Sequence, residues 1–275
     1  MPNTATNAND EVLTGKGSKS IIERFRLTGR AALVTGAGQG IGRGFAHALG
    51  EAGARVAVID IDKHRTASVI EELSGKGIIA TGIAADISDW AAAQAAVSKA
   101  AETLGRLDIA VNNAGLNRNS AAEETSAEEW DEAFALNTRG LFACCQAEAR
   151  VMLKAGYGKI INTASMASLI VPHPQKQAAY NATKAAVAQL TRTLAAEWAD
   201  RGIRVNCMSP GIINTALIAT NETLRPLVAE WVKQIPLGRL GEVSDLQAAI
   251  VYLACEASDY MTGHNLVIEG GQTLW

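Results

Sequence analysis

The sequence has no apolar run approaching the roughly 20 residues that a membrane-spanning helix needs, and no cluster of lysine and arginine. Residues 1–19 are rich in asparagine, threonine, glycine and lysine and do not resemble an apolar signal sequence. The formal net charge is only -3 and the pI is about 5.9, so no charge pattern favours nucleic acid or an anionic membrane. We therefore expect a soluble, cytoplasmic protein whose partner is a small-molecule substrate, with no nucleic acid and no membrane.

Cysteine is scarce as well. The four cysteines are Cys144, Cys145, Cys207 and Cys255, and they show no paired metal-ligand spacing. The adjacent pair could form only a strained disulfide. We expect all four to be reduced and in or near the core, and we predict no metal site.

What the chain does contain is an alternation of short Val/Ile/Ala runs with longer Ala/Leu-rich stretches from about residue 31 onward. This alternation predicts an α/β fold, a single-domain Rossmann-type doubly wound parallel seven-stranded sheet. The expected strands are 31–35, 56–60, 78–84, 109–113, 159–163, 204–208 and 266–269. The expected helices include 40–52, 90–104, 128–153, 179–199 and 243–255.

The domain boundaries follow from composition. Residues 26–275 carry no composition shift and are expected to form one domain. Residues 1–25 show little periodicity and are expected to form an N-terminal arm. Residues 210–241 are long for a loop in a compact domain, and we interpret them as a substrate lid.

A glycine-rich turn follows the first predicted strand. Gly36, Gly40 and Gly42 lie between that strand and a predicted helix, where backbone amides and the positive helix end can meet a pyrophosphate. A tight turn without a ligand would show the same glycines. Asp60 ends the next strand, near the position of the acid that binds the adenosine ribose in dinucleotide folds.

The Asp60 carboxylate would repel a ribose phosphate, which favours NAD over NADP. Arg43, Lys63 and Arg65 are close enough in sequence to leave NADP open as the alternative. After the third strand, Asp86 and Ile87 are candidates to contact adenine, although such a pair could also cap the next helix.

Tyr180 and Lys184 are four residues apart in a predicted helix, so both side chains lie on one face. A free phenol has a pKa of about 10, and work near pH 7 to 8 needs a shift of roughly two to three units. A shift of this size in the pKa of Tyr180 corresponds to about 3 to 4 kcal/mol. A positive charge on Lys184 at about 4 Å would contribute some 4 kcal/mol at an effective dielectric of 20, which is enough to produce that shift.

These motifs occur in the order of a known family. The glycine turn, Asn112 to Gly115, Asn137, Ser165, Tyr180 with Lys184, and Pro210-Gly211 resemble the short-chain dehydrogenase/reductase family over residues 26–275. The resemblance implies an oxidoreductase in which Tyr180 transfers the proton, Lys184 holds the nicotinamide ribose, Ser165 binds the substrate oxygen and Asn137 positions a water. It further implies cofactor contacts at Gly36, Gln39, Gly40, Ile41, Gly42, Asp60, Ile61, Asp86, Ile87, Asn113, Ala114, Gly115, Tyr180, Lys184, Pro210, Gly211, Ile213 and Thr215.

The spacing from Ser165 to Tyr180 departs from the family pattern. It is two residues longer because of the segment 172–177, which makes Ser168 a rival for the serine role. Ser165 is preferred because it directly follows the fifth predicted strand. The extra length suggests a remodelled substrate wall.

Several segments, including 172–177 and the C-terminal 270–275, are similar to bacterial polyol dehydrogenases of the galactitol type. That similarity implies NAD-dependent hydride transfer between a polyol and its ketone. Asn117, Ser165, His173 and Gln177 are the substrate-binding candidates, because polyol recognition requires several hydrogen bonds. The alternatives are an NADPH-dependent 3-oxoacyl thioester reductase and a non-catalytic cofactor-binding regulator. The resemblance also implies a homotetramer that buries the predicted helices 128–153 and 179–199.

Overall fold

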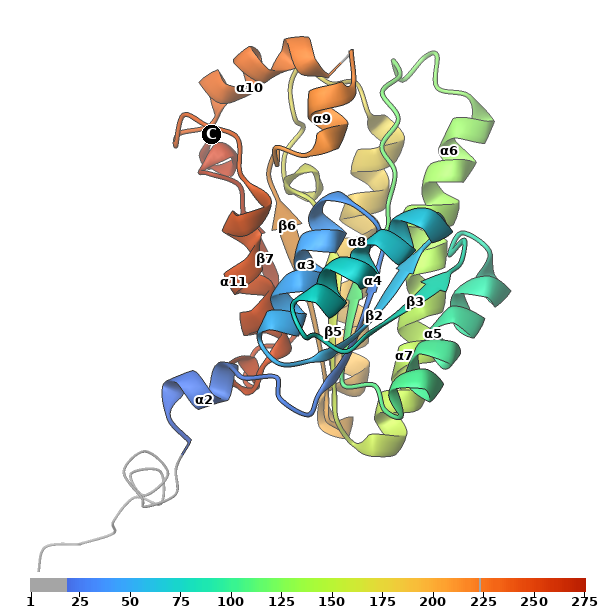
Figure 1. Ribbon diagram of the computed structural model, residues 1–275. Helices are drawn as coiled ribbons and strands as arrows, with labels where there is room; N and C mark the ends of the chain where they lie inside the picture. Colours follow the sequence, from blue (N-terminus) through green and yellow to red (C-terminus); the bar gives the residue numbers. More distant parts are fainter. Residues whose placement is uncertain (1–18, 223) are drawn as a thin grey trace, which may run out of the picture.

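The computed structural model describes residues 19–222 and 224–275. These residues form a seven-stranded parallel sheet in the order β3-β2-β1-β4-β5-β6-β7, which confirms the predicted Rossmann-type fold (Figure 1). The strands are β1 (Ala31–Thr35), β2 (Arg55–Asp60), β3 (Ala80–Ala84), β4 (Ile109–Asn112), β5 (Gly158–Thr163), β6 (Ile203–Pro210) and β7 (Asn265–Ile268).

Helices cover both faces of the sheet. Successive side chains of a strand point to opposite faces, so Leu33 packs into one hydrophobic cluster and Val34 into the other. The Leu33 cluster includes α5 (Trp90–Leu104), α7 (Leu141–Ala155) and α8 (Ala178–Trp198). The Val34 cluster includes α3 (Gly40–Glu51), α4 (Lys63–Gly75) and α11 (Val243–Ala254).

Local capping explains where several helices begin and end. The Asp62 carboxylate accepts hydrogen bonds from the backbone N–H groups of His64 and Arg65 at the start of α4. Asp89 caps α5 in the same way, and α5 ends at Gly105 with a left-handed φ of 73°. The strand and helix order could be predicted because such signals are local in sequence.

The predicted helix 128–153 is interrupted. It consists of α6 (Ala127–Phe134), a π-helical turn η1 (Ala135–Gly140) and α7. Gly140 allows this turn to approach the backbone of Ile87, because a Cβ at position 140 would overlap the Ile87 carbonyl. Such turns are rare and concentrate at functional sites. Asn137 lies within it.

Residues 210–241 contain structure of their own. They include α9 (Ala216–Thr220), η4 (Arg225–Leu227) and α10 (Val228–Gln234), which lie at the end of the molecule opposite α2 (Figure 1). Trp231 of α10 is 1% exposed and packs with Met166, Ile212 and Ile218 in a third cluster. Met166 belongs to the short 3-10 turn η2 (Met166–Ser168) that follows β5. This segment is therefore packed around its own small core.

The described part of the amino-terminal arm is ordered into a helix, which its weak periodicity did not predict. α2 (Ile21–Phe25) begins with a capping box between Ser20 and Glu23. Lys19 forms an ion pair of 2.6 Å with Glu256 of η5 (Glu256–Ser258). The predicted arm also includes residues 1–18, which lie outside the described residues.

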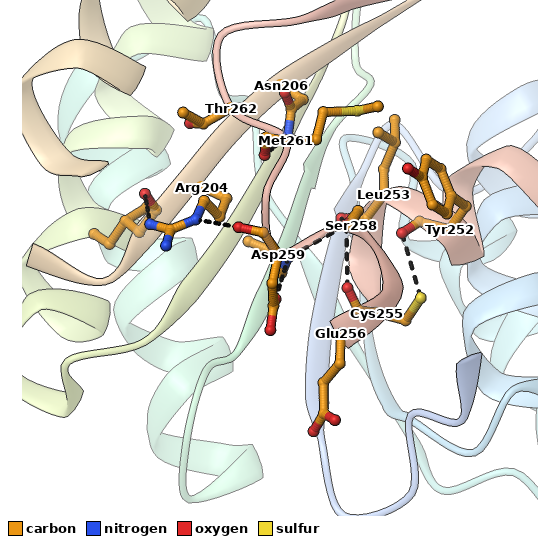
Figure 2. Close-up of polar contacts among 12 residues, drawn as sticks. Arg204, Asn206, Tyr252, Leu253, Cys255, Glu256, Ser258, Asp259, Met261 and Thr262 are labelled. Atoms are coloured by element: carbon orange, nitrogen blue, oxygen red, sulfur yellow. Dashed lines mark hydrogen bonds and ion pairs between the residues drawn. The ribbon is translucent and has the colours of Figure 1, made fainter. Parts of the chain in front are cut away.

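The turn at η5 leads the chain from α11 back to β7. Its Ser258 hydroxyl donates to the carbonyls of Leu253 and Cys255, and the Arg204 side chain donates to the Asp259 carbonyl (Figure 2). Lys159, fully buried at the start of β5, donates to the same Ser258 hydroxyl. The two remaining short turns are η3 (Ala199–Arg201) and η6 (Gln272–Leu274).

All four cysteines are buried and free, as expected from the sequence. Among residues 19–222 and 224–275, no helix is both long and apolar enough to cross a membrane.

Candidate active site

A cleft of about 290 Å³ opens where β1, β4, β5 and β6 end. The carboxyl ends of parallel strands meet at one edge of the sheet, and this edge is where such folds bind ligands. The cleft is lined by Gly36, Gln39, Gly40, Ile41, Asn113, Ala114, Gly115, Leu116, Asn117, Thr163, Ala164, Ser165, Tyr180, Lys184, Pro210, Gly211, Thr215 and Ala216.

The glycine turn forms one wall of this cleft. Gly36 has a left-handed φ of 61°, and a Cβ there would lie 2.7 Å from the Ala114 Cα. A Cβ at Gly42 would overlap the Gly36 carbonyl. α3 begins at Gly40 within the lining, so its positive end lies at the cleft. The wall fits the pyrophosphate of a dinucleotide, because backbone amides can approach an anion closely there.

Asp60 closes the glycine turn from the end of β2. Its Oδ2 atom accepts a hydrogen bond of 2.8 Å from the Gly38 N–H, and its Oδ1 atom accepts one from the Asp62 N–H. Asp60 is nearly buried but lies at the same edge as the glycine turn. This is the placement that ribose recognition requires.

The loop after β4 is tied directly to the glycine turn. The Thr35 hydroxyl accepts hydrogen bonds from the backbone N–H groups of Asn113 and Ala114, at 3.0 and 3.1 Å. In return, the Asn113 side-chain amide donates to the carbonyls of Thr35 and Gly36. Thr35 was not predicted as a site residue; its polar side chain at the end of a buried strand was the available signal.

Tyr180, Lys184 and Ser165 meet in the cleft. The Lys184 Nζ atom lies 5.6 Å from the centroid of the Tyr180 ring and donates a 2.7 Å hydrogen bond to the Thr163 carbonyl. One turn of α8 brings the two side chains together, as the sequence spacing predicts. Ser165 follows β5 and its hydroxyl accepts from the Ala167 N–H.

Burial sets the protonation of this group. It lowers the pKa of Lys184 to about 8 and raises the pKa of Tyr180 above its usual value, while the Ser165 side chain acts in the opposite direction on Tyr180. The pKa of Tyr180 is therefore raised by burial, and not lowered as predicted from its spacing to Lys184. The expectation omitted the desolvation that accompanies burial.

The Asn137 side chain connects the loop after β4 to helix α8. Its Oδ1 atom accepts from the Leu116 N–H, and its Nδ2 atom donates to the Leu116 carbonyl and the Thr183 hydroxyl. Thr183 in turn donates to the Tyr180 carbonyl. The fully buried Asn137 side chain therefore fixes the loop after β4 against the helix that carries Tyr180.

The cleft lining does not reach every residue predicted to contact the cofactor. Within the described chain, the lining leaves out Gly42, Asp60, Ile61, Asp86, Ile87 and Ile213. Asp60 is at the adjacent edge, and Ile61 beside it is exposed. The Asp86 carboxylate accepts from the N–H and hydroxyl of Ser88. Ile87 and Ile213 are buried in the two hydrophobic clusters.

The predicted substrate residues are separated by the structure. Asn117 lines the cleft, but His173 is exposed and the lining as described includes neither His173 nor Gln177. Gln177 is 6% exposed, and its Oε1 atom accepts a 2.8 Å hydrogen bond from Asn117. The rival serine, Ser168, donates its hydroxyl to the Ser165 carbonyl and lies on η2.

A buried polar cluster under the cleft was not predicted. The Asn112 side-chain amide donates to Glu148 Oε2 at 3.1 Å and to Asn162 Oδ1 at 3.1 Å. Burial raises the pKa of Glu148 to about 8. Asn162 also donates to Thr191. The cluster holds the ends of β4 and β5 together, and only the unusual Glu148 in an apolar helix face could have indicated it.

Comparison with known proteins agrees with this geometry. The family described as "Enoyl-(Acyl carrier protein) reductase" matches residues 36–273. A solved short-chain type dehydrogenase/reductase from Mycobacterium marinum is 41% identical, with a TM-score of 0.89, over 92% of this chain and 99% of that chain. The chain belongs to the short-chain dehydrogenase/reductase family. It is therefore an oxidoreductase by family, as the sequence motifs predict.

Relatives within the family carry several activities. A galactitol 2-dehydrogenase (L-tagatose-forming) of Cereibacter sphaeroides is 41% identical over 91% of this chain and 98% of its own length. A D-threitol dehydrogenase of Mycolicibacterium smegmatis is 40% identical, at 91% and 95% coverage. A 3-oxoacyl-[acyl-carrier-protein] reductase of Chlamydia pneumoniae is 37% identical, at 90% and 98% coverage.

Three similar solved structures contain NADP, and one of them also contains tartrate. The structure with tartrate is a gluconate 5-dehydrogenase from Burkholderia cenocepacia, 35% identical, with a TM-score of 0.86 over 93% of this chain and 100% of that chain. The family resemblance therefore supports a nicotinamide cofactor without choosing between NAD and NADP.

Proposed function

We propose that this protein is an NAD-dependent dehydrogenase that transfers a hydride between a secondary alcohol, specifically a polyol, and its ketone. The observation that carries the proposal is the meeting of Tyr180, Lys184 and Ser165 in a cleft bounded by the glycine turn. The similarity to galactitol and D-threitol dehydrogenases supports the polyol as substrate class.

Each side chain has one role in this proposal. Tyr180 accepts the hydroxyl proton while the hydride leaves the carbinol carbon, and Ser165 donates a hydrogen bond to the substrate oxygen. A bound oxidised nicotinamide would supply the hydride acceptor, and its positive charge would favour the ionised form of Tyr180 that burial alone disfavours. Lys184 places a positive charge beside the Tyr180 ring and Asn137 holds the loop and helix in register.

The choice of NAD rests on Asp60. Its carboxylate beside Gly38 would accept hydrogen bonds from ribose hydroxyls and repel a phosphate. Two of the nearby cations are engaged, since Arg43 pairs with Glu72 at 2.7 Å and Arg65 with Asp62 at 3.4 Å. Arg65 is nevertheless at this edge, with its Cβ close to Gly38, and it is the residue that NADP binding would recruit.

A 3-oxoacyl thioester reductase is the second candidate. It is favoured by the description of the matching family and by the reductase of Chlamydia pneumoniae. Such an enzyme would use NADPH, which the Asp60 carboxylate opposes. A cofactor-binding regulator without turnover is the non-enzymatic alternative, and the assembled Tyr180, Lys184 and Ser165 group argues against it.

The deciding experiment offers the purified protein a panel of polyols, simple secondary alcohols and acetoacetyl thioester, each with NAD and NADP or their reduced forms. Absorbance of the reduced cofactor reports turnover. The proposal expects turnover with polyols and NAD. Turnover confined to the thioester with NADPH would establish the second candidate, and cofactor binding without any turnover would support the regulator.

We also propose assembly as a homotetramer. An apolar groove runs between the η1–α7 region and α8, lined by Trp90, Phe134, Phe142 and Leu190 among others. Isologous packing of two copies would cover this groove. Light scattering at micromolar concentration should give four times the mass of the chain, and a monomeric mass would contradict the assembly.

A further inference from the structure

Three side-chain amides form a hydrogen-bonded row from the cleft to the catalytic helix. The Asn117 Nδ2 atom donates to Gln177 Oε1 at 2.8 Å, and the Gln177 Nε2 atom donates to Asn181 Oδ1 at 2.9 Å. Asn117 lines the cleft and is exposed there, whereas Gln177 is buried behind it. Asn181 directly follows Tyr180 in α8. The row therefore runs from the cleft wall to the residue that follows Tyr180 in α8.

Backbone pairing keeps the row in place. Ser120 N–H donates to the Lys176 carbonyl at 2.9 Å, and residues 120 and 177 form a parallel bridge. The loop after β4 and the segment 172–177 are thus joined beside the Asn117–Gln177 contact. The bridge therefore fixes the two backbone segments that carry these side-chain amides.

The row has a direction. A side-chain amide donates only through nitrogen and accepts only through oxygen, so each contact fixes which end of the amide faces its neighbour. Gln177 presents its oxygen to Asn117 and its nitrogen to Asn181. The Asn117 nitrogen is consequently held toward Gln177, and its carbonyl oxygen is the acceptor that Asn117 has for a ligand in the cleft.

We infer that Asn117 determines specificity by accepting a hydrogen bond from a second hydroxyl of a neutral polyol, and that Gln177 is a positioning residue that orients Asn117. This inference rests on the proposed function and refines its substrate class. A hydroxyl next to the reacting carbinol can donate to the side-chain oxygen of Asn117, while a monohydric alcohol has no second hydroxyl. A carboxylate at the same place has no hydrogen to donate and would be repelled by the lone pairs of the Asn117 oxygen. Aldonic acids should therefore be poor substrates.

The test compares threitol with 2-butanol at saturating NAD, in wild type and in three variants. Gln177→Leu removes both contacts of Gln177, and Asn117→Leu removes the acceptor. For both, the ratio of kcat/KM for threitol to that for 2-butanol should fall at least tenfold, mainly through KM for threitol. Gln177→Glu should retain most of the wild-type ratio of kcat/KM for threitol to that for 2-butanol, because a carboxyl oxygen still accepts from the Asn117 nitrogen.

A double variant separates positioning from direct contact. If Gln177 acts only through Asn117, then Asn117→Leu with Gln177→Leu should lose no more than Asn117→Leu alone. Additive losses would overturn the positioning role. Asn117 is exposed, so Asn117→Leu keeps the test available if Gln177→Leu fails to fold.

Other outcomes overturn the inference in distinguishable ways. Equal losses on threitol and 2-butanol, or unchanged ratios in both leucine single variants, would show a structural wall and leave the proposed dehydrogenase function intact. Wild-type turnover of gluconate above that of threitol would also refute the acceptor assignment. A wild-type enzyme that turns over no polyol at all would overturn the proposed function and this inference together.

Discussion

The two walls of the cleft are built by different means. On the cofactor side, the glycine turn and the loop after β4 continue directly from strands of the sheet, and Thr35 and Asp60 bond to their backbone N–H groups. On the substrate side, Asn117 lines the cleft, and the segment 172–177 behind it is held by side chains from distant elements. Asn117 and this segment together form the second wall. Gln175 accepts from the Trp231 indole of α10, and Gln177 accepts from Asn117.

The difference indicates what substitution can change. A wall whose position is set by strand ends cannot move without disturbing the sheet core, so its geometry is common to the fold. A wall held by a few side-chain contacts can be reshaped by single substitutions, since each contact contributes only about 1 kcal/mol. We therefore expect the first wall to determine cofactor binding and the second to determine which alcohol is used.

The largest expected effect concerns the support beneath the first wall. Burial raises the pKa of Glu148 to about 8 from 4.5, so the folded protein holds a protonated carboxyl while the unfolded chain ionises. The contribution of the Glu148 carboxyl to the free energy of unfolding is therefore fully present below about pH 4.5 and is lost as the pH rises to about 8. Glu148→Gln keeps an acceptor for Asn112 without titrating, so its advantage over wild type should grow across this window, to at most about 5 kcal/mol.

Urea unfolding at several pH values from 4.5 to 9 measures this advantage. The matched control is Glu102→Gln, because Glu102 is exposed and its side chain has the same chemistry. The difference in unfolding free energy between Glu102→Gln and wild type should change little with pH. A Glu148→Gln difference that does not change with pH would show that Glu148 is ionised in the folded protein.

The next effect lies on α8, where the walls meet. Tyr180→Phe removes the oxygen that accepts the proton and keeps the packing of the ring, so alcohol oxidation should fall at least ~100-fold. NAD affinity should remain within about threefold of wild type, because only one hydroxyl is lost from a wall made mostly of backbone. Steady-state turnover and fluorescence titration of the cofactor give the two numbers. Turnover above a tenth of wild type would contradict the role of Tyr180.

Asp60 tests the first wall alone. Wild type should prefer NAD to NADP by at least tenfold in kcat/KM, roughly 1.4 kcal/mol. Asp60→Asn retains an acceptor for Gly38 but not the charge, and should lose most of that preference while the polyol KM at saturating cofactor stays nearly constant. A wild type that uses both cofactors equally would show that Arg65 compensates, and a large change in polyol KM would show that the walls are coupled.

The sequence predicted the first wall far better than the second. The strands, the glycine turn, Asp60 and the Tyr180 with Lys184 pair are each encoded within a few residues, by burial on both faces or by helical spacing. The Asn117 to Gln177 contact joins residues 60 apart, which no local pattern specifies. The sequence therefore identified both residues as polar candidates without indicating that one is buried behind the other.

Two backbone features that no local sequence pattern predicted have the same physical origin. The π-helical turn at η1 depends on the close approach of Gly140 to Ile87, and helices α9 and α10 depend on apolar contacts with Met166. In both cases tertiary packing, not local propensity, decides the backbone. His173, which its polar side chain suggested as a ligand contact, lies exposed outside the cleft lining, and its carbonyl accepts from Gln234.

The smallest expected effect tests how the second wall is attached to α10. Gln175→Met leaves the buried Trp231 N–H without its 2.9 Å partner, at a cost of about 1 kcal/mol. The polyol KM should rise about threefold to fivefold, and the dissociation constant of NAD should not change. Gln234→Met is the matched control, because it removes an exposed bond to the same segment and should have a smaller effect. Equal increases in both variants would indicate general loosening, and a weaker NAD affinity in Gln175→Met would show that the two walls do not act independently.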